Sequence, residues 1–143
     1  MRVGTPPILQ LAALEASLDI WDGVDMAALR TASLALTDQF IAGIEAACPD
    51  LTLATPRAHD QRGSQVSFRH PEGYAIMQAL IAHRVIGDFR AGDQAGHPDI
   101  LRFGFTPLYL GFEDVWQAVE HLHQVLESGE WQRPEFNRQH AVT

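Results

Sequence analysis

The apolar residues of this chain change their spacing at Pro49, and that change limits the folds open to it. Before Pro49 they recur every three or four residues, which is the period of a helix with one apolar face. After Pro49 short, partly alternating segments that are typical of strands are interleaved with further stretches of helical spacing. The sequence therefore predicts an all-helical first third followed by a mixture of strands and helices.

Two helices are predicted before Pro49. The first covers residues 6–22, because the Thr5 hydroxyl can cap free backbone amides and Gly23 offers a stop. The second begins after Asp25, another capping residue, and ends where Pro49 forbids continuation. The apolar stripes are Ile8, Leu11, Leu14, Leu18 and Trp21 in the first helix, and Leu29, Leu36, Phe40, Ile41 and Ile44 in the second.

The rest of the chain is predicted to contain four strands and two helices. Pro107 should end the pairing of the last strand, since proline has no amide to donate, and Gly129 should close the last helix. The four strands are predicted at 51–54, 65–68, 85–89 and 100–105. One helix lies between the second and third strands, opens with His70-Pro71-Glu72 and has the apolar stripe Ile76, Met77, Leu80 and Ile81. The other helix covers 112–128 and has the stripe Phe112, Val115, Trp116, Val119, Leu122 and Leu126.

The predicted order, α-α-β-β-α-β-β-α, indicates the fold class. Strands in paired runs with helices between them are typical of an α+β domain, with a mostly antiparallel sheet covered on one face by helices. A length of 143 residues is that of one ordinary domain with a sizeable core.

The charge of the chain argues against polyanionic partners. Ten basic residues, all of them Arg, stand against eighteen acidic ones, which gives a formal net charge of −8. A nucleic-acid backbone or an anionic membrane would be repelled on average, so we expect neither as a partner.

The single cysteine and the hydropathy pattern bear on the compartment. Cys48 cannot form an internal disulfide or a zinc site of the CxxC type. No apolar run approaches the length of a membrane span, and the first residues lack the layout of a secretory signal. We therefore expect a reducing, cytoplasmic setting.

Arg102 is the most unusual polar residue, because it lies in the middle of the apolar run from Ile100 to Phe105. Alternation along a strand favours an outward-facing side chain, and any other placement would require an anionic partner. Asp88 and Arg90 alternate on the preceding strand, so they can lie on the same side and form an ion pair that supports Arg102.

Other combinations of reactive residues carry weaker signals. His121 and His123 are two apart on a helix and do not face each other, so no metal site is expected there. Ser64, His59 and Asp60 crowd into one loop without the geometry of a hydrolase triad. Cys48 invites comparison with persulfide-forming desulfurases, but beside Pro49 it is more simply a packing residue at a helix end.

Four segments, taken in chain order, resemble the carboxy-terminal part of kynureninases. They are GTPPIL at 4–9, RGSQVSFRHPEGY at 62–74, VIGDFR at 85–90 and ILRFGFTPLY at 100–109, and the ending RQHAVT is similar too. The resemblance spans essentially the whole chain. It implies the small domain of a fold-type-I pyridoxal-phosphate (PLP) enzyme, with residues 1–24 as a linker helix from a large amino-terminal domain and residues 25–143 as the small domain.

The resemblance also implies roles for two residues. Thr5 matches the position that helps to bind the PLP phosphate of the neighbouring subunit in a homodimer, and a hydroxyl beside helix amides suits an anion. Arg102 matches the arginine that grips the substrate's α-carboxylate through two charge-assisted hydrogen bonds. Residues 91–97 form a longer connection than is usual in the family, which is either a harmless surface loop or a change in how Arg102 is presented.

The implied activity is the hydrolytic cleavage of kynurenine or 3-hydroxykynurenine to anthranilate or 3-hydroxyanthranilate and alanine, in tryptophan catabolism. This chain has no lysine to hold PLP covalently, so alone it is expected to be inactive. Two alternatives stay open: the small domain of another fold-type-I lyase or desulfurase, and a stand-alone domain that binds a small carboxylate or a protein.

Overall fold

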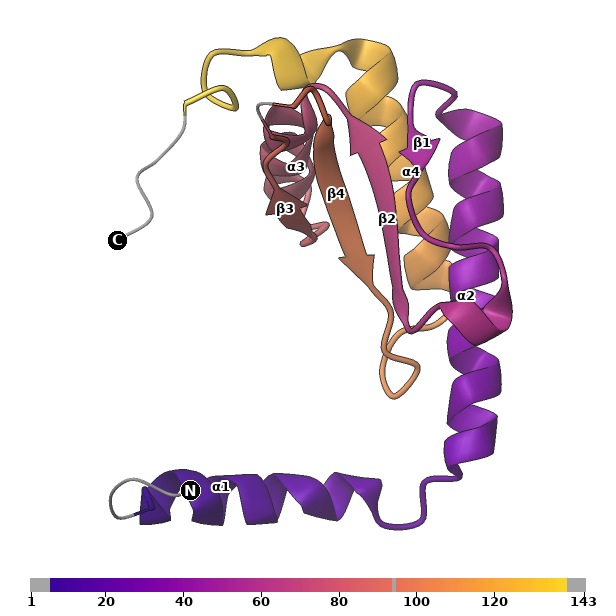
Figure 1. The fold of residues 1–143 in the computed structure, drawn as a ribbon, viewed down its shortest axis with the longest axis vertical. Helices are drawn as coiled ribbons and strands as arrows, with labels where there is room; N and C mark the ends of the chain where they lie inside the picture. The colour runs from indigo at the N-terminus through magenta and orange to yellow at the C-terminus, as the bar shows by residue number, and fades with distance from the viewer. Residues whose placement is uncertain (1–5, 94, 139–143) are drawn as a thin grey trace.

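The computed structural model describes residues 6–93 and 95–138, and its first third is helical (Figure 1). Helix α1 spans Ile8–Leu18 and runs into a 3-10 turn at Asp19–Trp21. Helix α2 spans Met26–Ala47 and begins at Asp25, whose carboxylate accepts hydrogen bonds from the amides of Ala27 and Ala28. Both helices predicted before Pro49 are therefore confirmed.

The remaining residues build a four-stranded sheet in the order β1-β2-β4-β3. All three neighbouring pairs are antiparallel, and β1 and β2 form a hairpin with a long connection. The strands are β1 at Thr52–Leu53, β2 at Gln65–His70, β3 at Asp88–Arg90 and β4 at Asp99–Gly104.

One face of this sheet is covered by three helices (Figure 1). They are α2, α3 at Gly73–Ala82, and α4 at Phe112–Ser128, which ends at Gly129 in a left-handed conformation with φ 67°. The predicted element order and the α+β class are thus confirmed. Within residues 6–93 and 95–138 no helix is long and apolar enough to cross a membrane.

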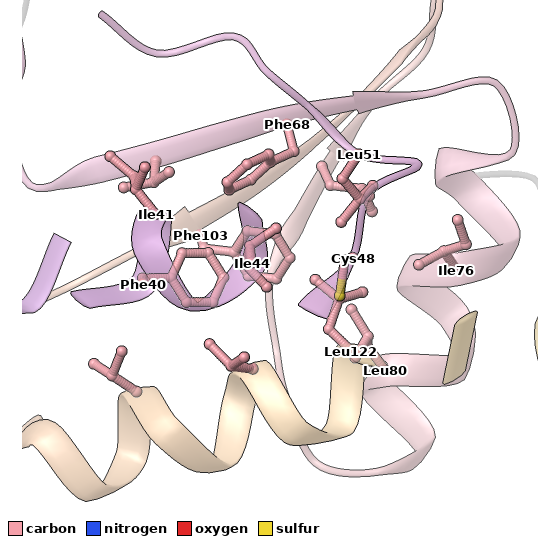
Figure 2. Close-up of a cluster of buried hydrophobic side chains, with 14 of the residues drawn as sticks. Phe40, Ile41, Ile44, Cys48, Leu51, Phe68, Ile76, Leu80, Phe103 and Leu122 are labelled. Carbon is pink, nitrogen blue, oxygen red and sulfur yellow. The ribbon is translucent and has the colours of Figure 1, made fainter. Parts of the chain in front are cut away.

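The hydrophobic core lies between the sheet and the helices, as Figure 2 shows. Phe40 of α2 is fully buried, and its ring centroid lies 5.0 Å from that of Phe103 and 4.9 Å from that of Phe105. Because Val66, Phe68, Leu101 and Phe103 all point into this core, the alternating residues of β2 and β4 point to the opposite, uncovered face.

The start of β3 differs from the prediction, which placed a strand at 85–89. Arg84 adopts a left-handed conformation with φ 65°, and the Val85 amide donates to the carbonyl of Leu80, so these residues still belong to the end of α3. Pairing with β4 begins only at Asp88. The apolar residues Val85 and Ile86 therefore belong to the end of α3 and to the connection that leads into β3.

Two apolar stripes are also placed differently from the prediction. On α4 the buried residues are Val115, Val119, Leu122 and Val125, whereas Phe112 and Trp116 are more than half exposed. Ile81 of α3 is 40% exposed, and no residue of α1 is buried. Helical spacing identifies an apolar face, but it does not show that the face has a partner within the same chain.

Candidate functional site

The uncovered face of the sheet carries a row of polar side chains across three strands. Arg102 on β4 pairs in register with Ser67 on β2 and with Asp88 on β3. Directly opposed residues of an antiparallel pair lie close enough for their side chains to interact. Strand pairing therefore brings Arg102 between a hydroxyl and a carboxylate that are distant from it in sequence.

The Arg102 guanidinium is held by two neighbours on this face. Its Nη1 lies 3.0 Å from Oδ2 of Asp88, and its Nη2 donates to Oε1 of Gln65 at 3.1 Å. The side chain remains 30% exposed. A guanidinium has five N–H groups, so after these two contacts it still has donors for a further acceptor from outside the described residues.

Asp88 joins two arginines. The same Oδ2 atom that contacts Arg102 lies 3.1 Å from Nη2 of Arg90. The ion pair between Asp88 and Arg90 that alternation predicts is therefore confirmed. Arg102 points away from the helix-covered face, as alternation favours, and its role in binding a carboxylate stays a prediction. One carboxylate shared by two guanidinium groups leaves this corner of the face with a net positive charge, which suits an anion.

A shallow cavity of about 330 Å³ lies over Arg102. Its wall includes Asp88, Gln65 and the two glycines Gly87 and Gly104. A Cβ atom added at Gly87 would lie 2.9 Å from the Arg102 carbonyl oxygen and 2.6 Å from Cε of Met77, so the backbone at this point passes too close for a side chain. Glycine at position 87 therefore lets the chain before β3 pass close to Met77 and to the backbone of β4.

The connection at 91–98 leaves this arrangement intact. Asp93 accepts hydrogen bonds from the amides of Ala95 and His97, and its carboxylate contacts the His97 ring at 2.8 Å. The register of β3 with β4 runs up to Arg90 opposite Ile100. The longer loop therefore closes on itself and does not displace the Arg102 strand.

Thr5, the predicted phosphate ligand, lies outside the described residues. The first described residues show Pro7 as the N-cap of α1, with its carbonyl accepting from the Leu11 amide at 3.0 Å. In Figure 1, α1 lies beyond the end of the sheet where β2 begins and β4 ends. The role of Thr5 stays a prediction.

The residues that sequence reasoning set aside have other partners. His59 contacts Asp38 at 2.9 Å, while Ser64 accepts a hydrogen bond from Ser33 at 2.7 Å, so no triad forms in this loop. His123 lies 3.5 Å from Glu127. Across the part of the chain that the structure describes, no group of three or more His, Cys, Asp or Glu side chains is arranged to hold a metal ion.

Sequence reasoning missed Gln65 and Gly87. Gln65 reaches Arg102 only because β2 lies beside β4, a pairing that brings together residues 37 positions apart. The signal for Gly87 was its place before the Asp88–Arg90 segment, since a glycine beside a strand often marks a close approach of another backbone.

Comparison with known proteins places these features in a family. The family model of the kynureninase C-terminal domain matches residues 29–122. Over 142 residues, 98% of this chain, the sequence is 54% identical to the kynureninases of Burkholderia mallei and Burkholderia pseudomallei and 52% identical to that of Pseudomonas fluorescens. The match covers 33% of each relative, so the chain spans about a third of their length.

Proposed function

Because the chain belongs to the kynureninase family, we propose that it is the carboxy-terminal part of a PLP enzyme that hydrolyses L-kynurenine. The products would be anthranilate and L-alanine, or 3-hydroxyanthranilate and L-alanine from the 3-hydroxylated substrate. The pathway would be tryptophan catabolism leading toward NAD. The observation that supports a substrate-binding role for this chain is the guanidinium of Arg102. It still has free N–H donors and lines a cavity on the uncovered face of the sheet.

Arg102 would bind the α-carboxylate of the amino-acid substrate. A planar guanidinium can donate two parallel hydrogen bonds to a carboxylate, and hydrogen bonds to charged groups are worth about 1.5–3 kcal/mol each. Gln65 and Asp88 hold the guanidinium in one orientation before the substrate arrives. Fixing the carboxylate fixes the rest of the small substrate, which is a large part of catalysis by positioning.

The cofactor would be held mainly by the missing part of the enzyme. The sequence offers arginines, and Thr5 at the start of the chain, but no lysine, so these residues fit contacts to anionic groups and not covalent attachment of PLP. When bound, PLP supplies the electron sink for cleavage of the carbon–carbon bond. Thr5 would contact the PLP phosphate across a homodimer interface, where a hydroxyl and the free amides of the first turn of α1 would both suit an anion.

The large amino-terminal domain is the partner that this proposal requires first. The apolar side chains of α1 and the turn after it are 41–87% exposed, among them Leu9, Leu11 and Leu14. An apolar surface of this kind is normally covered by another domain or subunit. Residues 1–24 would then act as the linker between two domains, residues 25–143 would form the small one, and the enzyme would work in the cytoplasm.

The proposal is tested with the full-length protein that contains this chain. It should release anthranilate from kynurenine, and it should not release sulfide or alanine from cysteine, as a desulfurase would. Arg102→Ala should raise KM for kynurenine by about tenfold to a hundredfold, from the loss of one or two charge-assisted hydrogen bonds. The absorbance of bound PLP should not change.

A matched control separates this effect from a general loss of positive charge. Arg57 lies in the connection after β1, forms an exposed ion pair with Glu45 and does not line the cavity over Arg102. Arg57→Ala should leave KM within about twofold of the original value, since exposed ion pairs contribute little. Equal KM values for the Arg102→Ala and unmodified enzymes would contradict the proposed role.

A further inference from the structure

A second cavity opens on the helical side of the sheet, between the end of α3 and the first half of α4. Its volume is about 420 Å³, which lies within the range of pockets that hold small molecules. Its inner wall is aromatic, since it reaches the cluster of Phe40, Phe103 and Phe105. Such a wall suits a flat, ring-shaped group.

The polar side of this cavity contains an imidazole with an unused nitrogen. Nδ1 of His121 is buried and has no hydrogen-bond partner among the described residues. The His121 ring stacks on that of His83, with centroids 5.4 Å apart and planes inclined by 27°, and His83 is itself bonded to Glu130. A buried polar atom without a partner costs free energy, and a ligand atom in the cavity would remove that cost.

Arg84 lies on the same wall in a strained backbone conformation. It is the one non-glycine residue with positive φ in the described chain, at 65°. Hydrogen bonds from its own amide to Ile81 and from the Val85 amide to Leu80, of 2.9 and 3.0 Å, hold it there. Glycine or asparagine would adopt this backbone conformation at a lower cost in free energy. This position has an arginine instead, which places a cation beside the cavity. Arg84 is exposed, and none of the ion pairs within the described residues involves its guanidinium.

We propose that this cavity binds a small aromatic carboxylate. The ring would lie against the phenylalanine wall, and the carboxylate would meet the Arg84 guanidinium and the His121 imidazole. A purely apolar ligand would leave Nδ1 of His121 without a partner, and a cation would be repelled by Arg84.

Two other polar residues on the wall are already occupied. Asp114 accepts from the Gly111 amide at 2.7 Å, and Gln117 donates to Glu113 at 3.0 Å. The Asp114 charge disfavours an anion at that end of the cavity, so the carboxylate would lie toward α3. The site is separate from that of Arg102, which lies on the other face of the sheet, although Ile86 and Gly104 line both cavities.

Benzoate is the probe for this proposal, with benzyl alcohol as its uncharged counterpart. In amide ¹H–¹⁵N spectra of the 143-residue chain, benzoate should shift resonances of cavity residues such as Leu110, Ala118 and His121. Benzyl alcohol should bind at least tenfold more weakly, because its neutral hydroxyl cannot form an ion pair with the Arg84 guanidinium. No shift at the cavity residues, or equal affinity for both compounds, would overturn the proposal.

Two variants make the test specific. Arg84→Asn removes the cation and keeps a residue that tolerates positive φ, so the chain should stay folded while benzoate binding weakens about tenfold or more. Ala118→Met extends a side chain from α4 into the cavity and should abolish binding. Arg69→Gln is the control, because Arg69 is an exposed residue on the other face of the sheet and should not alter benzoate affinity.

The spectra themselves report whether each variant is folded, and Arg84→Asn and Ala118→Met act through different parts of the cavity. Benzoate affinity unchanged in a folded Arg84→Asn variant would overturn the proposal, even if Ala118→Met failed to fold. The assay contains neither PLP nor kynurenine. Its outcome is therefore independent of the proposed enzyme activity.

Discussion

Asp88 and Arg102 face each other across β3 and β4, and their side chains meet at 3.0 Å on the face of the sheet that none of the described helices covers. If Arg102 binds the substrate as proposed, the Asp88 carboxylate can affect that binding in two opposite ways. It can orient the guanidinium, which favours binding, or it can compete with the substrate for the same donors. The two effects predict opposite changes in KM when Asp88 is removed.

We expect orientation to dominate, because the shared contact with Arg90 keeps Asp88 in place when a ligand approaches. In the full-length enzyme Asp88→Ala should raise KM for kynurenine about three- to tenfold with little change in kcat, since a misplaced guanidinium weakens binding. Asp88→Asn retains an acceptor oxygen and should stay close to the original KM. A fall in KM for Asp88→Ala would show competition instead.

Asp38 and Arg62 form a second polar contact, which fastens the loop before β2 to α2. The Arg62 side chain is only 2% exposed, and it also donates to the Arg57 carbonyl at 2.9 Å. Asp38→Asn would leave a buried guanidinium without its carboxylate. Because Asp38 is half exposed, we expect a loss of about 1–2 kcal/mol in the free energy of unfolding at pH 7, measured by urea denaturation.

The same pair predicts a pH dependence. Burial alone would raise the pKa of Asp38, but hydrogen bonds and charge from Arg62, joined by His59, outweigh it and lower the pKa below its usual value. A carboxylate with a lowered folded pKa stabilises fully above its unfolded pKa of about 4 and loses that contribution as pH falls through the folded value. The stability difference between the original chain and Asp38→Asn should therefore shrink below about pH 4, and a constant difference down to pH 2 would contradict it.

Cys48 provides a test that separates a packing role from sulfur chemistry. The side chain is 2% exposed, and burial, with a smaller effect from the charge of Asp50, raises the pKa of its thiol to about 11. A thiol that is neither accessible nor ionised reacts slowly with disulfide reagents. In the folded chain at pH 8, Cys48 should react with a chromogenic disulfide at a small fraction of the rate seen in urea, and equal rates would contradict its burial in the core.

The order of elements could be predicted from sequence because its signals are local. Asp25 caps the helix that it precedes, and Gly129 adopts the left-handed conformation that ends α4. The start of β3 could not be predicted in this way. Val85 and Ile86 are typical strand residues, but the Val85 amide bonds back to Leu80 of α3, and only pairing with β4 decides that the strand begins at Asp88.

Part of the candidate site could also be predicted from the sequence, because some of its contacts are local. Asp88 and Arg90 alternate within three residues, so their ion pair follows from strand geometry. Gln65 contacts Arg102 only through the neighbour relation of β2 and β4, and sequence does not specify that relation locally. The exposure of Phe112 and Trp116 is likewise a matter of which helix faces find partners, which periodicity alone does not decide.

Gly87 and Gly104 form a matched pair for testing how closely the backbone is packed under Arg102. Both line the Arg102 cavity, but a Cβ atom at Gly87 would meet Met77 at 2.6 Å and the Arg102 carbonyl oxygen at 2.9 Å, whereas one at Gly104 meets nothing within 4 Å. Gly87→Ala should therefore lower the free energy of unfolding by about 1–3 kcal/mol, since Met77 can move but the backbone of β4 cannot move cheaply. Gly104→Ala should change it by less than about 0.5–1 kcal/mol, and with a favourable sign, because alanine restricts the unfolded chain more than glycine does. Urea denaturation of both variants gives the comparison, and equal losses would mean that β4 accommodates a side chain at position 87.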